Sequence, residues 1–425
     1  MKQLVKSCLN GLLSIVRLVM RIGQSIKSLL GLAPGWRGFQ RWLLQIGALG
    51  TLAGAGGLLA AALGLVPIKA SSGHWPITAW FLNFTMSRSV STHAMGIQAP
   101  MLDDPGMIIK GATHYETGCF PCHGNPAIQH PRIARQMTPH PPYLPPVVHE
   151  WEPKELFYIV KHGVKFTGMP AWPSKQRDDE VWAMVAFLQK LPELDEKEYR
   201  SMVSGESLAS RENAASGEYM PSGFDAPLQS LAGPTAGARS ISYSCGRCHG
   251  MNGQGREAGV APKLAGQQPA YLEASLDAFI RGDRHSGIME PIATGLTRDE
   301  RREVAQYFGQ LAPSQVSPQS SKTSELAISR GATIALEGVT KARIPVCAQC
   351  HGPSANARNA RYPTLAGQYA DYLVLQLELF ADKKRGGTEF APLMHPVVDH
   401  MTNEQIRDVA MYYESLTSSI IQSKW

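Results

Sequence analysis

Three short stretches of the chain place two cysteines and a histidine close enough to share one chemical task. They read CFPCH at 119–123, CGRCH at 245–249 and CAQCH at 347–351. Three chemistries use residues of this kind: a zinc site, a thiol redox pair, and the covalent attachment of a c-type haem. The residues concerned are Cys119, Cys122, His123, Cys245, Cys248, His249, Cys347, Cys350 and His351.

The arrangement of the three motifs favours haem attachment. A structural zinc site needs four ligands from neighbouring pairs, yet these pairs lie about a hundred residues apart and each has its own histidine. A thioredoxin-like dithiol is expected in a βαβ pattern, which the sequence lacks. In a C-x-x-C-H haem site, both thiols form thioethers with the porphyrin and the histidine binds the iron. We therefore predict three covalently bound haem c groups.

A methionine follows each motif at a similar place, ahead of the last helix of the segment: Met169, Met289 and Met394. A methionine thioether closes the second axial position of the iron and raises its reduction potential. Methionine also fills gaps in cores, but the shared placement favours ligation. Met401 aligns with Leu296, so we expect it to be a packing residue. The competing axial ligands are His162 in the first segment, His285 in the second, and His395, His400 or Met401 in the third.

The segments that follow the second and third motifs are copies of one another. Both contain the word LAGQ, at 264–267 and 365–368, and both end in an amphipathic helix. Two capping boxes mark the starts of these helices: Thr297 with Glu300, and Thr402 with Gln405. No long run alternates in the manner of a strand, so we predict an all-α fold.

Composition and repeats divide the chain into seven parts. Residues 42–68 carry no charge over 27 positions, which is long enough for a transmembrane helix. Residues 130–150 hold six prolines, so we expect irregular backbone there. The predicted parts are a basic amphipathic segment at 1–41, a transmembrane anchor at 42–68, a first domain at 100–200, a linker at 201–230, a second domain at 231–313, a linker at 314–325 and a third domain at 326–418.

The charge distribution predicts the topology. Residues 1–41 hold seven Lys and Arg and no acidic residue, so the remaining 34 basic groups meet 35 acidic ones, a net charge of −1. We expect no nucleic-acid partner. A basic head before an apolar span favours a cytoplasmic N-terminus, with membrane lipid around the span. We predict a single-pass protein of the inner (cytoplasmic) membrane with its haem domains in the periplasm. A cleaved signal peptide is the alternative.

The three segments resemble class I c-type cytochromes. Residues 230–418 resemble a tandem dihaem cytochrome of the c-four type, with its CxxCHG, PxLAGQ and YL…QL…F words, and a monohaem domain with a GMP ligand loop precedes it. The resemblance covers about residues 100–418 and excludes the N-terminus. It implies that the carbonyl oxygens of Pro262 and Pro363 hold the ligand histidines. The first domain offers several prolines for this role, and the sequence does not choose among them.

The resemblance implies a carrier and not an enzyme. We expect single electrons to pass along the periplasmic face, from a quinol-oxidising complex or a dehydrogenase to a terminal oxidase or a soluble cytochrome of a respiratory chain. One alternative is an electron-accepting haem subunit of a membrane dehydrogenase complex. Another is a haem enzyme such as a peroxidase, which would need an iron without a strong sixth ligand and an acid or base above it.

Overall fold

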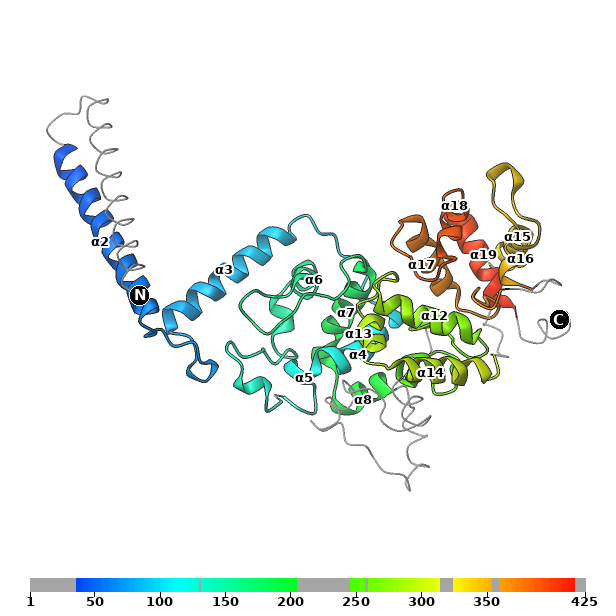
Figure 1. Cartoon of the computed structure of the whole chain (residues 1–425), viewed down its shortest axis with the longest axis horizontal. Coiled ribbons are helices and arrows are strands. Elements are labelled where there is room, and N and C mark those ends of the chain that lie inside the picture. Colours follow the sequence, from blue (N-terminus) through cyan, green and yellow to red (C-terminus); the bar gives the residue numbers. More distant parts are fainter. Residues whose placement is uncertain are drawn as a thin grey trace, which may run out of the picture. The chain divides into compact units, whose positions relative to one another are not determined.

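The computed structural model describes residues 36–129, 131–204, 245–256, 259–313, 324–353 and 359–416. It divides the chain into two compact units, Met1–Ser72 and Gly73–Trp425. The predicted amphipathic segment and Cys8 lie outside the described residues, as do most residues of both predicted linkers. Within the described ranges every regular element is a helix, and the extended contacts are two isolated bridges (Figure 1). The all-α prediction is confirmed.

The first unit contains one long apolar helix, α2 (Trp36–Ala62), followed by the short 3-10 turn η1 (Ala70–Ser72). Residues Gln40–Ala62 are long and apolar enough to cross a membrane. The helix ends six residues before the predicted end of the span. Gly64 has φ +71°, and the amides of Gly64 and Leu65 bond back to Ala61 and Ala60, the pattern of a Schellman motif.

The second unit begins with helix α3 (Pro76–Ala94), which the sequence analysis did not anticipate. The Ser91 hydroxyl donates to Glu155 Oε1 at 2.7 Å, so α3 is joined to the first domain. The other elements of this domain are α4 (Pro105–Gly118), α5 (Phe120–His123), η2 (Ala134–Gln136), η3 (Val148–Glu150), α6 (Pro153–His162), α7 (Asp178–Lys190), η4 (Leu191–Glu193) and α8 (Glu196–Ser204).

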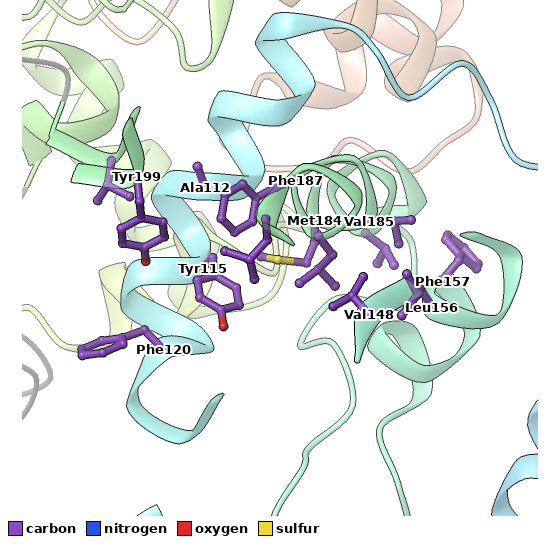
Figure 2. Packing of buried hydrophobic residues seen from close by; sticks show 14 of the residues in the cluster. Ala112, Tyr115, Phe120, Val148, Leu156, Phe157, Met184, Val185, Phe187 and Tyr199 are labelled. Carbon is purple, nitrogen blue, oxygen red and sulfur yellow. The ribbon is translucent and has the colours of Figure 1, made fainter. Parts of the chain in front are cut away.

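The core of the first domain forms where α4 meets α7 (Figure 2). Tyr115 and Phe187 are fully buried there, with ring centroids 5.1 Å apart. A Cβ atom at Gly111 would collide with the carbonyl oxygen of Ala183, so the two helices cross at the distance that only glycine allows. Helix α8 adds the buried Val203 to this core. Residues 201–204 therefore belong to the domain and not to the predicted linker.

The second and third domains share one plan. In the second, residues 245–249 are helical, followed by α12 (Pro269–Ile280), α13 (Met289–Thr294) and α14 (Arg298–Gln310). The third contains α15 (Ser324–Glu337), η6 (Thr340–Ala342), α16 (Ala348–His351), α17 (Ala370–Ala381), η7 (Ala391–Met394), α18 (His395–Val398) and α19 (Asn403–Ser415). Helix α15 starts two residues before the predicted domain boundary at 326.

Both predicted capping boxes are present. The Thr297 hydroxyl accepts the Glu300 amide at 3.3 Å, and the Thr402 hydroxyl accepts the Gln405 amide at 3.2 Å. The faces expected to be apolar are buried, with Phe308 in α14 fully enclosed. These caps fix where the last helix of the second and third domains begins, after the short helices α13 and α18 that follow the start of each candidate methionine segment.

Candidate functional site

Each motif forms one helical turn that is followed by a sharp change of direction. The His123 amide bonds to the carbonyl of Cys119 and the His351 amide to that of Cys347, both at 2.9 Å. This places the two cysteines and the histidine of a motif on one turn. The next residue is a glycine with positive φ in every motif: Gly124 at +71°, Gly250 at +77° and Gly352 at +74°.

The histidines of the second and third motifs are held by proline carbonyls. His249 Nδ1 lies 2.8 Å from the carbonyl oxygen of Pro262, and His351 Nδ1 lies 2.9 Å from that of Pro363. A carbonyl only accepts, so Nδ1 carries the proton and Nε2 keeps its lone pair for a metal. Pro262 and Pro363 thus make the contacts that the resemblance implies.

The first domain uses the same device with a different proline. His123 Nδ1 lies 2.9 Å from the carbonyl oxygen of Pro142, in the proline-rich segment. The sequence could not choose this proline because the first domain has no LAGQ word to mark it. The structure thus selects Pro142 from the several prolines among which the sequence could not choose.

The first thiol of each motif is unsuited to thiolate chemistry. Burial, with a smaller contribution from the second thiol of the motif, raises the pKa of Cys119 and Cys245 to about 12. Burial likewise raises the pKa of Cys347 to about 11. Neutral thiols are poor zinc ligands and poor redox nucleophiles. Among the residues that the structure describes, no three His, Cys, Asp or Glu side chains converge on a possible metal position.

A cavity of about 1170 Å³ lies in the second unit. Most of its lining comes from the second and third domains, and residues of α4 and α7 in the first domain, such as Lys110 and Glu180, also line it. A pocket for one small molecule has about 300–1,000 Å³, so this cavity has room for more than one such group. Its lining includes both motifs and both candidate methionines: Cys245, Cys248, His249, Met289, Cys347, Cys350, His351 and Met394. The sequence-predicted residues of these two domains are thus brought together.

The alternative ligands occupy distinct places. His285 and Met401 also line the cavity, and Met401 packs against the cores of the third domain. His395 is not among the residues that line the cavity, and its Nδ1 lies 2.9 Å from the carbonyl oxygen of Phe380. His162 ends helix α6 and is exposed, and His400 is exposed after α18.

The candidate methionine of the first domain sits in its own loop. Met169 is half-buried, and its carbonyl oxygen accepts the Val164 amide at 3.2 Å. The Met169 amide in turn donates to the Thr167 hydroxyl at 3.1 Å. These two bonds close the loop that carries Met169.

Two buried arginines also face the shared cavity. Arg284 and Arg385 are 9% and 8% exposed, and within the described residues neither pairs with a carboxylate. Arg284 Nη2 donates to the Tyr372 hydroxyl at 2.9 Å, and Arg385 Nε donates to Gln376 Oε1 at 2.7 Å. Burial, together with the charge of Arg284, lowers the pKa of Arg385 to about 10.

Buried guanidinium groups without anions are costly, so this cavity favours a guest that carries carboxylates. Haem carries two propionates, and the residues present therefore fit this group: thiols, a histidine, a methionine and cations surround one apolar space. Sequence reasoning missed Arg284 and Arg385. The two arginines stand at matching positions after α12 and α17, and this repetition in the sequence could have marked them as site residues. In the structure their backbones form an isolated bridge.

Two family models match the chain. The model described as "Cytochrome C oxidase, cbb3-type, subunit III" matches residues 106–188, and the model described as "Cytochrome c" matches residues 235–312 and 329–417. The three matched ranges each contain one motif.

Several characterised proteins are similar to part of the chain. A cytochrome c-552 of Acidithiobacillus ferridurans is 35% identical over 180 residues, which are 41% of this chain and 75% of that protein. A thiosulfate dehydrogenase electron acceptor of Thiomonas intermedia is 35% identical over 177 residues, covering 42% of this chain and 80% of the relative. A cytochrome c4 of Thiocapsa roseopersicina is 30% identical over 197 residues, covering 46% and 98%.

Proposed function

Because the chain belongs to the c-type cytochromes, the electron-transfer proteins that bind haem c covalently, we propose that it is a membrane-anchored carrier with three haem c groups. The observation that carries this proposal is the repeated histidine geometry. Three motif histidines each direct Nδ1 to a proline carbonyl at 2.8–2.9 Å, which leaves three Nε2 atoms for three irons.

The proposed roles follow from the chemistry of each residue. The six motif cysteines would anchor the porphyrins as thioethers, and His123, His249 and His351 would ligate the irons. Met169, Met289 and Met394 would each supply a second ligand. Haem supplies one-electron redox chemistry, while this chain excludes water, fixes the histidine tautomer and closes each iron to other ligands.

We propose that α2 is the anchor and that the haem domains lie in the periplasm. The span Gln40–Ala62 supports the anchor by its length and composition. Aromatic side chains at the start of α3 support a membrane-surface role for that helix, since Trp75, Trp80 and Phe81 are 62%, 60% and 57% exposed. Tryptophan and phenylalanine of this kind suit the boundary between lipid and water.

The partners in this proposal are other redox proteins. The donor is a quinol-oxidising complex or a dehydrogenase, and the acceptor is a terminal oxidase or a soluble cytochrome. A second candidate function is that of an electron-accepting subunit of a dehydrogenase complex. The similarity to a thiosulfate dehydrogenase electron acceptor and to a cytochrome subunit of sulfide dehydrogenase supports this candidate. Co-purification from solubilised membranes would distinguish the two, because a subunit remains with its dehydrogenase and a free carrier does not.

Intact mass tests the haem count. We expect the purified protein to exceed the mass of its polypeptide by three haems. Replacing both cysteines of one motif by alanine is expected to remove one haem and leave two. A parent protein with two haems or fewer, made in cells with a working maturation system, would overturn the proposal.

A further inference from the structure

A buried carboxylate of the first domain holds a loop of the second. Glu180 lies in α7 and is 2% exposed. Its Oε1 accepts the Ser286 hydroxyl at 2.6 Å, and its Oε2 accepts the Gly287 amide at 2.6 Å. Trp172 Nε1 donates to the same Oε2 at 3.3 Å, so both carboxylate oxygens are engaged.

Two further residues of this loop are bound by the first domain. Arg177 Nη1 donates to the carbonyl oxygen of His285 at 2.9 Å and lies 2.9 Å from Glu180 Oε1. The side chain of Ile288 packs against the hydrophobic core of the first domain. Four consecutive residues, 285–288, are therefore fixed by contacts outside their own domain.

The next residue along the chain is Met289, and the same contacts reach it. The Ser286 hydroxyl oxygen accepts the Met289 amide at 3.0 Å and the Ile288 amide at 3.3 Å, so Ser286 holds the two amides at the start of α13. A hydroxyl has one proton, and here that proton goes to Glu180. The carboxylate thus orients the hydroxyl that orients the amide of Met289.

The described residues of the other two domains arrange this stretch differently. In the first, the Thr167 hydroxyl of the same loop accepts the Met169 amide. In the third, the residue three before Met394 is Ala391, which has no hydroxyl. Arg385, whose backbone forms an isolated bridge with that of Arg284, stands nine residues before Met394. Arg284 stands only five residues before Met289, so the loop to the methionine is longer in the third domain.

We propose that Glu180 is a positioning residue for the second haem, because it holds Ser286 and the Met289 loop of a different domain in the geometry needed for iron ligation. This inference rests on the proposed function, in which Met289 is the sixth ligand. It goes beyond that function by making the ligation of one haem depend on the domain that carries another.

The test compares Glu180→Ala and Ser286→Ala with the parent full-length protein in detergent. Ferric haem with a methionine ligand has a weak near-infrared charge-transfer band. We expect each variant to lose up to about a third of this band, since one haem of three is affected. We also expect carbon monoxide to bind up to one ferrous haem in the variants and none in the parent. Hydrogen exchange of a peptide covering 284–289 should become faster in Glu180→Ala, because the Gly287 amide loses its acceptor.

Asp408→Asn is the matched control. Asp408 is also a buried acid, 4% exposed, and it pairs with Arg330 in the third domain. Its replacement is expected to leave the band and the 284–289 peptide unchanged. Ser286→Ala guards against misfolding of Glu180→Ala, because it keeps the Arg177–Glu180 ion pair.

Two results would overturn the inference in different ways. If Met289→Leu removes about a third of the band but both Glu180→Ala and Ser286→Ala keep all of it, Glu180 does not position the ligand and the proposed function stands. If Met289→Leu itself leaves the band intact, the ligand assignment fails and the inference fails with it.

Discussion

Pro142 stands among six prolines at 130–150, and its carbonyl oxygen holds His123. Pro262 and Pro363 could be predicted because each stands two residues before LAGQ, a local word. Pro142 could not, because the pairing is fixed by how an irregular segment folds over the motif. The contact of Glu180 with Ser286 was even less predictable, because the two residues are 106 positions apart and no local sequence pattern indicates the bond.

His114 makes a prediction at the scale of one residue. Its Nδ1 atom is buried without a hydrogen bond within the described structure, and its ring stands edge-on to Trp172 at 5.0 Å. Burial, with a smaller effect of Lys110, lowers the pKa of His114 to about 4. The unfolded chain therefore takes up a proton near pH 6.5, before the folded chain does.

Stability from His114 is thus complete above about pH 6.5 and is lost as the pH falls towards about 4. Between about pH 8 and pH 5 we expect the parent protein to lose about 2 kcal/mol of unfolding free energy from this one group. The His114→Leu variant lacks this titrating group, so its loss of unfolding free energy between the two pH values should be smaller than the parent's by that amount. Urea titrations at both pH values measure the difference. An equal loss in parent and variant would show that the ring is solvated in the folded protein.

At the scale of elements, two domains use the same helix crossing. A Cβ atom at Gly111 of α4 would meet the carbonyl oxygen of Ala183 in α7, and one at Gly331 of α15 would meet that of Asp408 in α19. Both glycines open a Gly-Ala-Thr triplet, at 111–113 and 331–333. This shared triplet was an overlooked signal that α4 and α15 are equivalent.

The last helices were predictable from their caps and periodicity, whereas α3 was not, because its apolar residues are largely exposed.

Gly111→Ala should push α4 away from α7. Overpacking at a backbone contact costs about 1–3 kcal/mol, so we expect the urea midpoint of the first domain to fall clearly. Gly96→Ala is the control, since nothing lies within 4 Å of a Cβ atom there. If both variants unfold at the parent midpoint, the close crossing of α4 and α7 is wrong.

At the scale of the whole molecule, the proposed anchor makes a prediction about topology. High salt should leave the protein in the membrane fraction, because apolar burial and not charge retains α2. Protease added outside the inner membrane should digest the chain beyond about residue 70, as the basic head favours a cytoplasmic N-terminus. Release of the intact haem portion by salt alone would contradict the anchor, and protection of the haem domains would contradict the orientation.

The central proposal is that three irons are each closed by one histidine and one methionine, as expected of a carrier and not of a peroxidase. The near-infrared charge-transfer band of the oxidised protein measures this directly. We predict the intensity of three haems, with about a third lost in each of Met169→His, Met289→His and Met394→His, and none lost in Met401→Leu. A parent protein with a weaker band, and with a five-coordinate haem that binds peroxide or carbon monoxide, would contradict the account.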